Sequence, residues 1–188
     1  MKNLKIAILM TIATTVLLGI IYPLVVTGLA QVLMHDKANG QLIYRKGELV
    51  GSNIIGQAFT GAGYLHPRPS AAGNGYDAAN SGGSNLGPTN QKLIDRVKAD
   101  TARLQAENPG QPVPVDLVTT SASGLDPDIT PAAAAFQVPR IAKARGMSEQ
   151  QVREIIARHT AGRQWGFLGE PRVNVLQVNL ELDQVSRK

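Results

Sequence analysis

The chain has 188 residues, of which 43% are hydrophobic but only 4% aromatic, so a folded core must consist mostly of aliphatic side chains. It contains 19 Lys and Arg against 14 Asp and Glu, and no basic run is interleaved with aromatic residues. This pattern argues against nucleic-acid binding. The absence of cysteine excludes disulfides, thiolate metal sites and thiol nucleophiles.

The N-terminal segment is long and apolar, and residues 6–34 carry no charged side chain. A helix needs only about 20 residues to cross the hydrocarbon core of a bilayer. We therefore predict a single transmembrane helix within an anchor formed by residues 1–34. A cleavable signal peptide is the alternative, because Gly28 and Ala30 form a small-x-small site, but its apolar region would have only about 7 to 15 residues.

The charges next to this segment predict its orientation. Lys2 and Lys5 precede the apolar run, and the positive-inside rule places such a basic end in the cytoplasm. The domain formed by residues 35–188 is then extracytoplasmic, which in a cell with an inner membrane means periplasmic.

Small residues recur at every fourth position of the apolar run. In lipid, small side chains permit close approach of helix backbones, although Thr and Gly are also common in membrane spans generally. The candidates for packing against a partner helix are Ala7, Thr11, Thr15 and Gly19. Further along, Pro23 is expected to kink the helix.

The remaining residues predict short strands and capped helices. Strands are expected at residues 41–44 and 49–55, separated by a turn at residues 45–47. Three helices are expected from their N-terminal signals: Asn90 as N-cap of the first, Thr130 followed by Pro131 for the second, and a capping box of Ser148 and Gln151 for the third. Within the second helix, Pro139 is expected to cause a break or kink, and Gly146 to end the helix.

Two more strands complete the prediction. Residues 113–119 lie among prolines, which favours an edge strand. Residues 172–183 alternate apolar and polar residues but change phase, which we interpret as a strand with a bulge near Val175 and Leu176. Helices mixed with short strands are typical of an α+β domain.

Residues 56–90 are rich in Gly, Ser, Asn and Pro, a composition typical of a linker or a disordered segment. Tyr64, Tyr76 and Leu86 offer apolar surface that a linker lacks, so an ordered functional loop is the alternative.

The motifs indicate little independent chemistry. Gly51 and Gly56 have the glycine spacing of a phosphate-binding loop, but Gln57 and Ala58 replace the residues that hold phosphate and Mg²⁺, which favours a strand and turn. The three histidines, His35, His66 and His159, do not have the spacing of metal ligands. No serine triad pattern occurs either. An independent enzyme is therefore not expected.

A few charged residues stand out in the loops. Two prolines flank Arg68 and would stiffen its backbone, so that its guanidinium is presented at low entropic cost. A salt bridge to Asp77 is the alternative. Asp126 and Asp128 are expected to complement the N-terminus of the following helix rather than to act in acid–base catalysis.

Five sequence blocks, following the N-terminal span in order, resemble those of the C subunit of Kdp-type potassium-transporting ATPases. A mild departure is Leu65, where a second aromatic residue would be expected after Tyr64. The blocks are residues 51–57, 68–71, 81–86, 123–127 and 173–176.

The resemblance implies a non-catalytic accessory subunit of an inner-membrane potassium uptake complex that uses ATP, Mg²⁺ and potassium. Its partners would be a channel-like potassium-binding subunit, a P-type ATPase subunit and a small single-span subunit. The candidate loop that contacts a partner or the ion entrance comprises Arg68, Ser70, Ser81, Gly82, Gly83, Ser84 and Asn85.

The resemblance also implies a catalytic-chaperone role, in which the subunit raises the ATP affinity of the ATPase subunit. ATP is cytoplasmic, whereas the predicted topology places the domain outside, so a domain that covers the outer ion entrance is physically simpler. A stand-alone, membrane-anchored extracytoplasmic binding protein or enzyme remains the main alternative, and a nucleotide-binding regulator with a cytoplasmic domain is a third.

Overall fold

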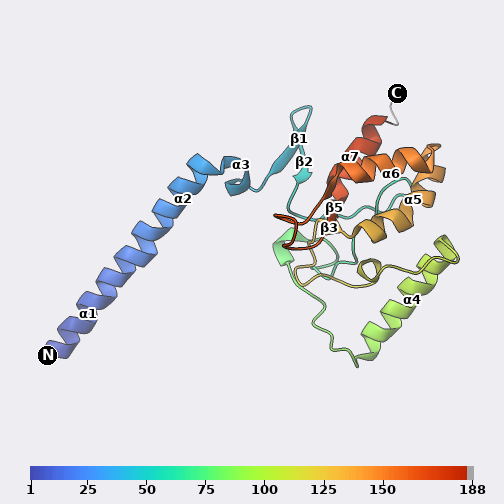
Figure 1. Cartoon of the computed structure of the whole chain (residues 1–188). Helices are drawn as coiled ribbons and strands as arrows, with labels where there is room; N and C mark the ends of the chain where they lie inside the picture. The colour runs from blue at the N-terminus through green and yellow to red at the C-terminus, as the bar shows by residue number, and fades with distance from the viewer. Residues whose placement is uncertain (186–188) are drawn as a thin grey trace. The chain divides into compact units, whose positions relative to one another are not determined.

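The computed structural model describes residues 1–185 and divides into two compact units, residues 1–50 and the part from Gly51 onward. In the first unit, one continuous helix runs over Lys2–Leu33 (Figure 1). Its most apolar window has a mean hydropathy of 2.3, so the helix is long and apolar enough to cross a membrane. None of its side chains is buried within the chain, which leaves its apolar surface for lipid or another helix.

This helix consists of α1 (Lys2–Thr14), a π-helical segment η1 (Thr15–Ile21) and α2 (Tyr22–Leu33). Pro23 lies in the first turn of α2, directly after the π-helical segment. Proline has no backbone N–H and its ring crowds the carbonyl four residues earlier, so regular α-helical bonding cannot continue through this turn. The structure shows i→i+5 bonding over Thr15–Ile21, directly before this turn, and the kink expected at Pro23 stays a prediction.

The rest of the first unit is a short helix, α3 (His35–Ala38), and a two-stranded sheet of β1 (Leu42–Arg45) and β2 (Glu48–Ser52). Lys46 and Gly47 have φ of 51° and 84°. Positive φ at both central residues of a hairpin turn gives the twist that paired strands need. The predicted strand, turn and strand are confirmed, except that the second strand ends at Ser52.

The core of the second unit is formed by three helices and a three-stranded antiparallel sheet. The helices are α5 (Pro131–Arg145), α6 (Glu149–Arg158) and α7 (Val175–Val185), which gather beside β3 and β5 in Figure 1. The strand order is β3 (Asp128–Ile129), β5 (Arg172–Asn174), β4 (Thr160–Ala161). The fully buried side chains include Leu65, Ile141, Ile155, Val173, Val178 and Leu182. Together these elements confirm the α+β class.

Most predicted helix ends are confirmed by their caps. The Thr130 hydroxyl accepts from Ala133 N–H at 3.1 Å, and Ser148 and Gln151 form the capping box of α6. Gly146 ends α5 with φ of 64°, a conformation that glycine adopts without steric penalty. Asn90 caps α4 (Gln91–Glu107), which runs apart from the other helices and contributes Leu104 to the core (Figure 1).

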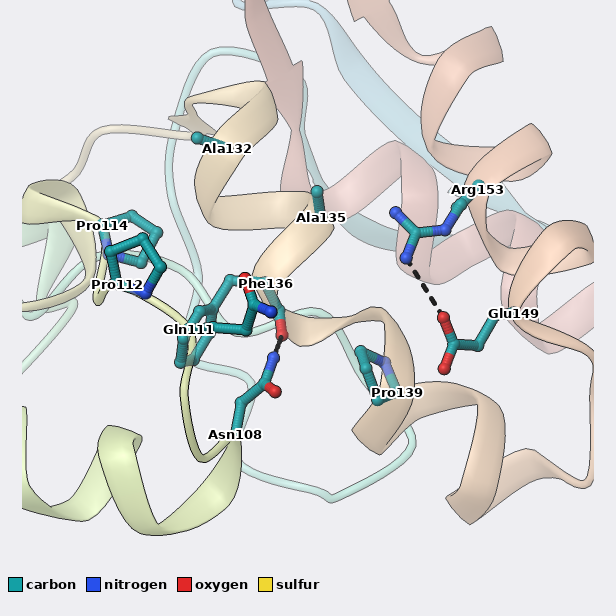
Figure 2. Close-up of a pocket in the computed structure, with 10 residues that line it drawn as sticks. All are labelled: Asn108, Gln111, Pro112, Pro114, Ala132, Ala135, Phe136, Pro139, Glu149 and Arg153. Carbon is teal, nitrogen blue, oxygen red and sulfur yellow. Dashed lines mark hydrogen bonds and ion pairs between the residues drawn. The ribbon is translucent and has the colours of Figure 1, made fainter.

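Helix α5 continues through Pro139. Beside this position the Asn108 side chain donates to the Phe136 carbonyl at 2.9 Å (Figure 2). An external donor of this kind can satisfy a carbonyl next to a proline-interrupted bonding ladder.

Two predicted strands are wrong. Residues 113–119 contain a 3₁₀ helix, η3 (Val115–Leu117), and residues 172–183 form only the short β5 before α7 begins. The change of phase in the apolar–polar alternation reflects a helix rather than a bulged strand. Its buried residues lie at the helical spacing i, i+3, i+4 and i+7, namely Val175, Val178, Asn179 and Leu182.

The glycine-rich segment is an ordered loop, which confirms the alternative to a linker. Two buried side-chain amides hold its backbone. Asn179 of α7 accepts from Leu65 N–H at 2.7 Å and donates to Leu65 C=O at 2.9 Å. Gln137 of α5 accepts from His66 N–H at 2.8 Å and donates to His66 C=O at 3.0 Å. We call these four bonds the amide clamp.

Replacing one clamp amide tests its contribution to stability. Asn179→Leu leaves the N–H and C=O of Leu65 buried without partners, which we expect to lower the free energy of unfolding by about 2 to 5 kcal/mol. Urea unfolding of the detergent-purified chain, followed by circular dichroism, measures this loss. The exposed Gln150→Ala is the control and should change the value by less than about 0.5 kcal/mol. Equal stability of the two variants would contradict the role of the clamp.

Candidate functional site

Arg68 connects two loops that are far apart in the sequence. Its guanidinium forms an ion pair with Asp126 at 3.0 Å and donates to the main-chain carbonyls of Thr119 at 3.3 Å and Thr120 at 3.4 Å. The alternative prediction, a salt bridge from Arg68 to Asp77, is wrong. The Asp77 carboxylate instead accepts from Ala79 N–H and from the Asn80 amide. It thereby caps the 3₁₀ helix η2 (Ala78–Asn80). Arg68 is therefore engaged inside the domain.

Ser70 continues this connection. Its hydroxyl donates to Gly124 C=O at 2.6 Å and accepts from Tyr76 N–H at 2.8 Å. The Tyr76 hydroxyl donates to Arg68 C=O. Burial raises the pKa of Tyr76 above its usual range, and the Asp126 charge adds to this rise. The phenol therefore stays protonated and keeps its role as a donor.

The Ser-Gly-Gly-Ser block packs against the same partner loop. Ser81 Oγ and Gly82 N–H both donate to Ser123 C=O, at 3.0 and 2.9 Å. Gly124 has φ of 67°, and a Cβ on it would lie 2.6 Å from Ala72 N. Only glycine fits such a close approach. We call residues 68–83 and 119–126 the paired loops.

The paired loops unite five of the predicted site residues, namely Arg68, Ser70, Ser81, Gly82 and Gly83. Ser84 and Asn85 follow directly, and Asn85 has φ of 51°. The polar groups of the paired loops largely bond to one another, which gives a rigid shape rather than an activated nucleophile. Within residues 1–185, no group of three acidic or histidine side chains is placed to hold a metal ion.

The two aspartates that end the second paired loop and follow it, Asp126 and Asp128, form ion pairs. Asp126 binds Arg68, and Asp128 binds Arg172 at 3.0 Å and Asn174 at 3.1 Å. Burial raises the pKa of Asp128 despite these partners. Their expected role at a helix N-terminus is wrong.

The carboxylate at the start of α5 belongs to the buried Asp116, which accepts from Thr130 N–H at 2.8 Å. This role of Asp116 was not predicted, because the residue lies far from the helix along the chain.

A cleft of about 460 Å³ borders the paired loops and is lined by residues that include Phe59, His66, Arg68, Tyr76 and Arg103. Burial lowers the pKa of His66, and the positive charge of Arg140 lowers it further, so the imidazole is neutral at pH 7. The His66 Nε2 lies 2.9 Å from Gly61 C=O, which fixes the ring against the loop backbone.

A second cleft, of about 440 Å³, lies between the loop at Pro112 and Pro114 and helix α5 (Figure 2). Its wall is mainly proline, alanine and Phe136, and Glu149 and Arg153 pair at 3.1 Å at one side. This lining offers an apolar surface and no catalytic grouping.

The predicted helix-packing residues all lie in the exposed N-terminal helix. Ala7 and Thr11 belong to α1, and Thr15 and Gly19 to the π-helical segment. A Cβ built on Gly19 would lie 3.9 Å from Thr15 Cγ2, an ordinary contact. Residue 19 therefore has room for a Cβ in the isolated helix.

One exposed feature was not predicted. Trp165, the single tryptophan of the chain, and Phe167 lie between β4 and β5 with exposures of 84% and 67%. The available signal was an aromatic pair among the glycines Gly162, Gly166 and Gly169.

The fold defines a class of protein in which one apolar helix anchors a small α+β domain. The family model for the c chain of the K⁺-transporting ATPase matches residues 4–184, and the chain belongs to this family.

Curated relatives agree over nearly the whole length, and each bears the name potassium-transporting ATPase KdpC subunit. The protein of Koribacter versatilis is 68% identical, covering 97% of this chain and 94% of the relative. That of Acidobacterium capsulatum is 61% identical over 98% of this chain and 100% of the relative. The Rhodospirillum rubrum protein is 55% identical over 98% of this chain and 96% of the relative.

The fork of hydrogen bonds made by Arg68 can be tested by a conservative change. Arg68→Lys keeps the charge but not the planar fork, so we expect faster amide hydrogen exchange in both paired loops. Mass spectrometry of the full chain in detergent measures this exchange. Arg103→Lys, at a side chain with 57% exposure, is the control. Unchanged exchange in residues 119–126 would show that Arg68 does not hold the loops together.

Proposed function

We propose that this chain is the non-catalytic, membrane-anchored subunit of an ATP-driven potassium uptake complex, required for assembly and activity of the pump. The family match over residues 4–184 carries the proposal. It is supported by relatives named as subunits of a potassium-transporting ATPase and by paired loops whose polar groups bond to one another. A stand-alone binding protein is disfavoured because those relatives are all named as subunits.

The partners in this proposal are a channel-like potassium-binding subunit, a P-type ATPase subunit and a small single-span subunit. The apolar helix meets them in the membrane, since its side chains are exposed along the whole span in the isolated chain. The paired loops offer a rigid surface next to a cleft, which suits contact with a partner or with the ion entrance.

In this proposal the N-terminus is cytoplasmic and the α+β domain lies outside the inner membrane, because Lys2 and Lys5 flank the span. ATP and Mg²⁺ then bind to the ATPase subunit on the other side. A catalytic-chaperone effect that raises ATP affinity acts through the membrane helices, as a coupling between distant sites.

The topology can be measured with single cysteines, because the chain contains none. Asn3→Cys and Gln150→Cys are both at exposed positions. A membrane-impermeant maleimide added to intact spheroplasts should label Gln150→Cys and leave Asn3→Cys unlabelled until the cells are lysed. Labelling of Asn3→Cys alone would reverse the orientation and leave the domain in the cytoplasm.

The helix contact can be tested at Gly19. The wild-type chain should co-purify with the potassium ATPase subunits, and Gly19→Leu should reduce this recovery several-fold because Leu prevents close approach of a partner helix. A Cβ at residue 19 meets only an ordinary contact in the isolated helix, so a loss of recovery reports on the partner. Leu29→Ala, at an exposed position outside the stripe, is the control. Full recovery of Gly19→Leu would exclude the small-residue stripe as a docking face.

A further inference from the structure

The segment between β4 and β5 forms a hairpin with an aromatic tip. Gln164 and Leu168 exchange two main-chain hydrogen bonds, at 2.8 and 2.9 Å. At its base, Arg163 and Glu170 form an ion pair at 2.6 Å. We call residues 163–170 the aromatic hairpin.

Trp165 occupies a position that does not suit its side chain. Trp165 and Gly166 have φ of 52° and 84°, and Phe167 N–H donates to Gln164 C=O at 3.2 Å. Positive φ at both central residues defines a turn that favours Asn or Asp followed by Gly. A bulky residue at the first of these positions is a conformational outlier.

The exposed aromatic side chains do not stabilise the core. Trp165 is 84% exposed, Phe167 67% and Leu168 42%. A large indole in a strained position, mostly in water, contributes little to folding. Such outliers cluster at functional sites, and exposed aromatic groups of this kind are typical of interfaces.

Several main-chain N–H groups of the hairpin already have hydrogen-bond partners, which favours its burial against a partner. The N–H groups of Gly166, Phe167 and Leu168 all donate to main-chain carbonyls within the hairpin. These three donors are therefore already paired before a partner covers the tip, which lowers the cost of desolvating them on binding.

The charges at the base favour a protein over a lipid surface. Glu170 has a side-chain exposure of 74%, and Arg163 is already paired with it. An exposed carboxylate at the base of the hairpin disfavours an anionic membrane, and the paired guanidinium is not offered to lipid phosphates.

We propose that the aromatic hairpin docks Trp165 and Phe167 into an apolar pocket on another protein subunit of the potassium-transporting complex. This inference rests on the proposed function. Tryptophan is enriched among interface hot spots, and the partner pocket must supply an acceptor for the indole N–H.

Cross-linking identifies what covers the tip. The full chain, with p-benzoylphenylalanine in place of Trp165, is co-expressed with the ATPase subunits and irradiated. We expect a cross-link to another subunit, and none from the same group at the exposed position of Gln150. A lipid adduct alone, a cross-link to a second copy of this chain, or no cross-link in an intact complex would each overturn the docking inference. If the wild-type chain does not co-purify with the ATPase subunits, the proposed function itself fails.

A second variant separates docking from folding. Trp165→Gly removes the side chain and suits the backbone, so the melting temperature of the isolated chain should equal or exceed that of the wild type. The dissociation constant for the partner subunits should rise at least about tenfold. Val115→Ala, at an apolar residue with 68% exposure, should change neither. Unchanged affinity of Trp165→Gly, or a lower melting temperature, would show that Trp165 serves the fold rather than an interface.

Discussion

The amide clamp on Leu65 and His66 is the constraint on which the ordered part of the glycine-rich segment depends. Its two amides are almost fully buried, with 1% exposure each, and they come from different helices, Gln137 from α5 and Asn179 from α7. Backbone groups of a loop cannot be buried unless they are paired. The clamp supplies those pairs, so Leu65 can enter the core although it belongs to no strand or helix itself.

The position of the paired loops follows from the clamp. Arg68 lies two residues after the clamped His66, with prolines on both sides, and its guanidinium then reaches the loop that ends at Asp126. The absence of a side chain at Gly124 lets the backbones of the two paired loops lie in direct contact. A segment with the composition of a linker thus becomes a fixed surface, because its hydrogen bonds are supplied by the α5–α7 core and by a second loop.

Two of the exposed apolar surfaces differ in kind. The N-terminal helix exposes apolar side chains along its whole length, as a helix in lipid must. The aromatic hairpin exposes a few large side chains on a backbone in which the N–H groups of Gly166, Phe167 and Leu168 already donate within the hairpin. Both features suit a chain that works bound to a membrane and to other proteins.

The sequence by itself determined the apolar span, the α+β class and most helix ends. These depend on composition and on caps such as Ser148 with Gln151, which act within a few residues. It also contained five sequence blocks in the order found in the family, which indicated the family.

Only the tertiary structure decided which partners the polar loop residues take. Arg68 pairs with Asp126 rather than the nearby Asp77, and Asp116 rather than Asp126 or Asp128 meets α5, because these contacts join segments far apart in the chain. The same holds for the last element, where burial of Val175 to Leu182 against α6 and β5 selects a helix over the alternating strand that local pattern favours.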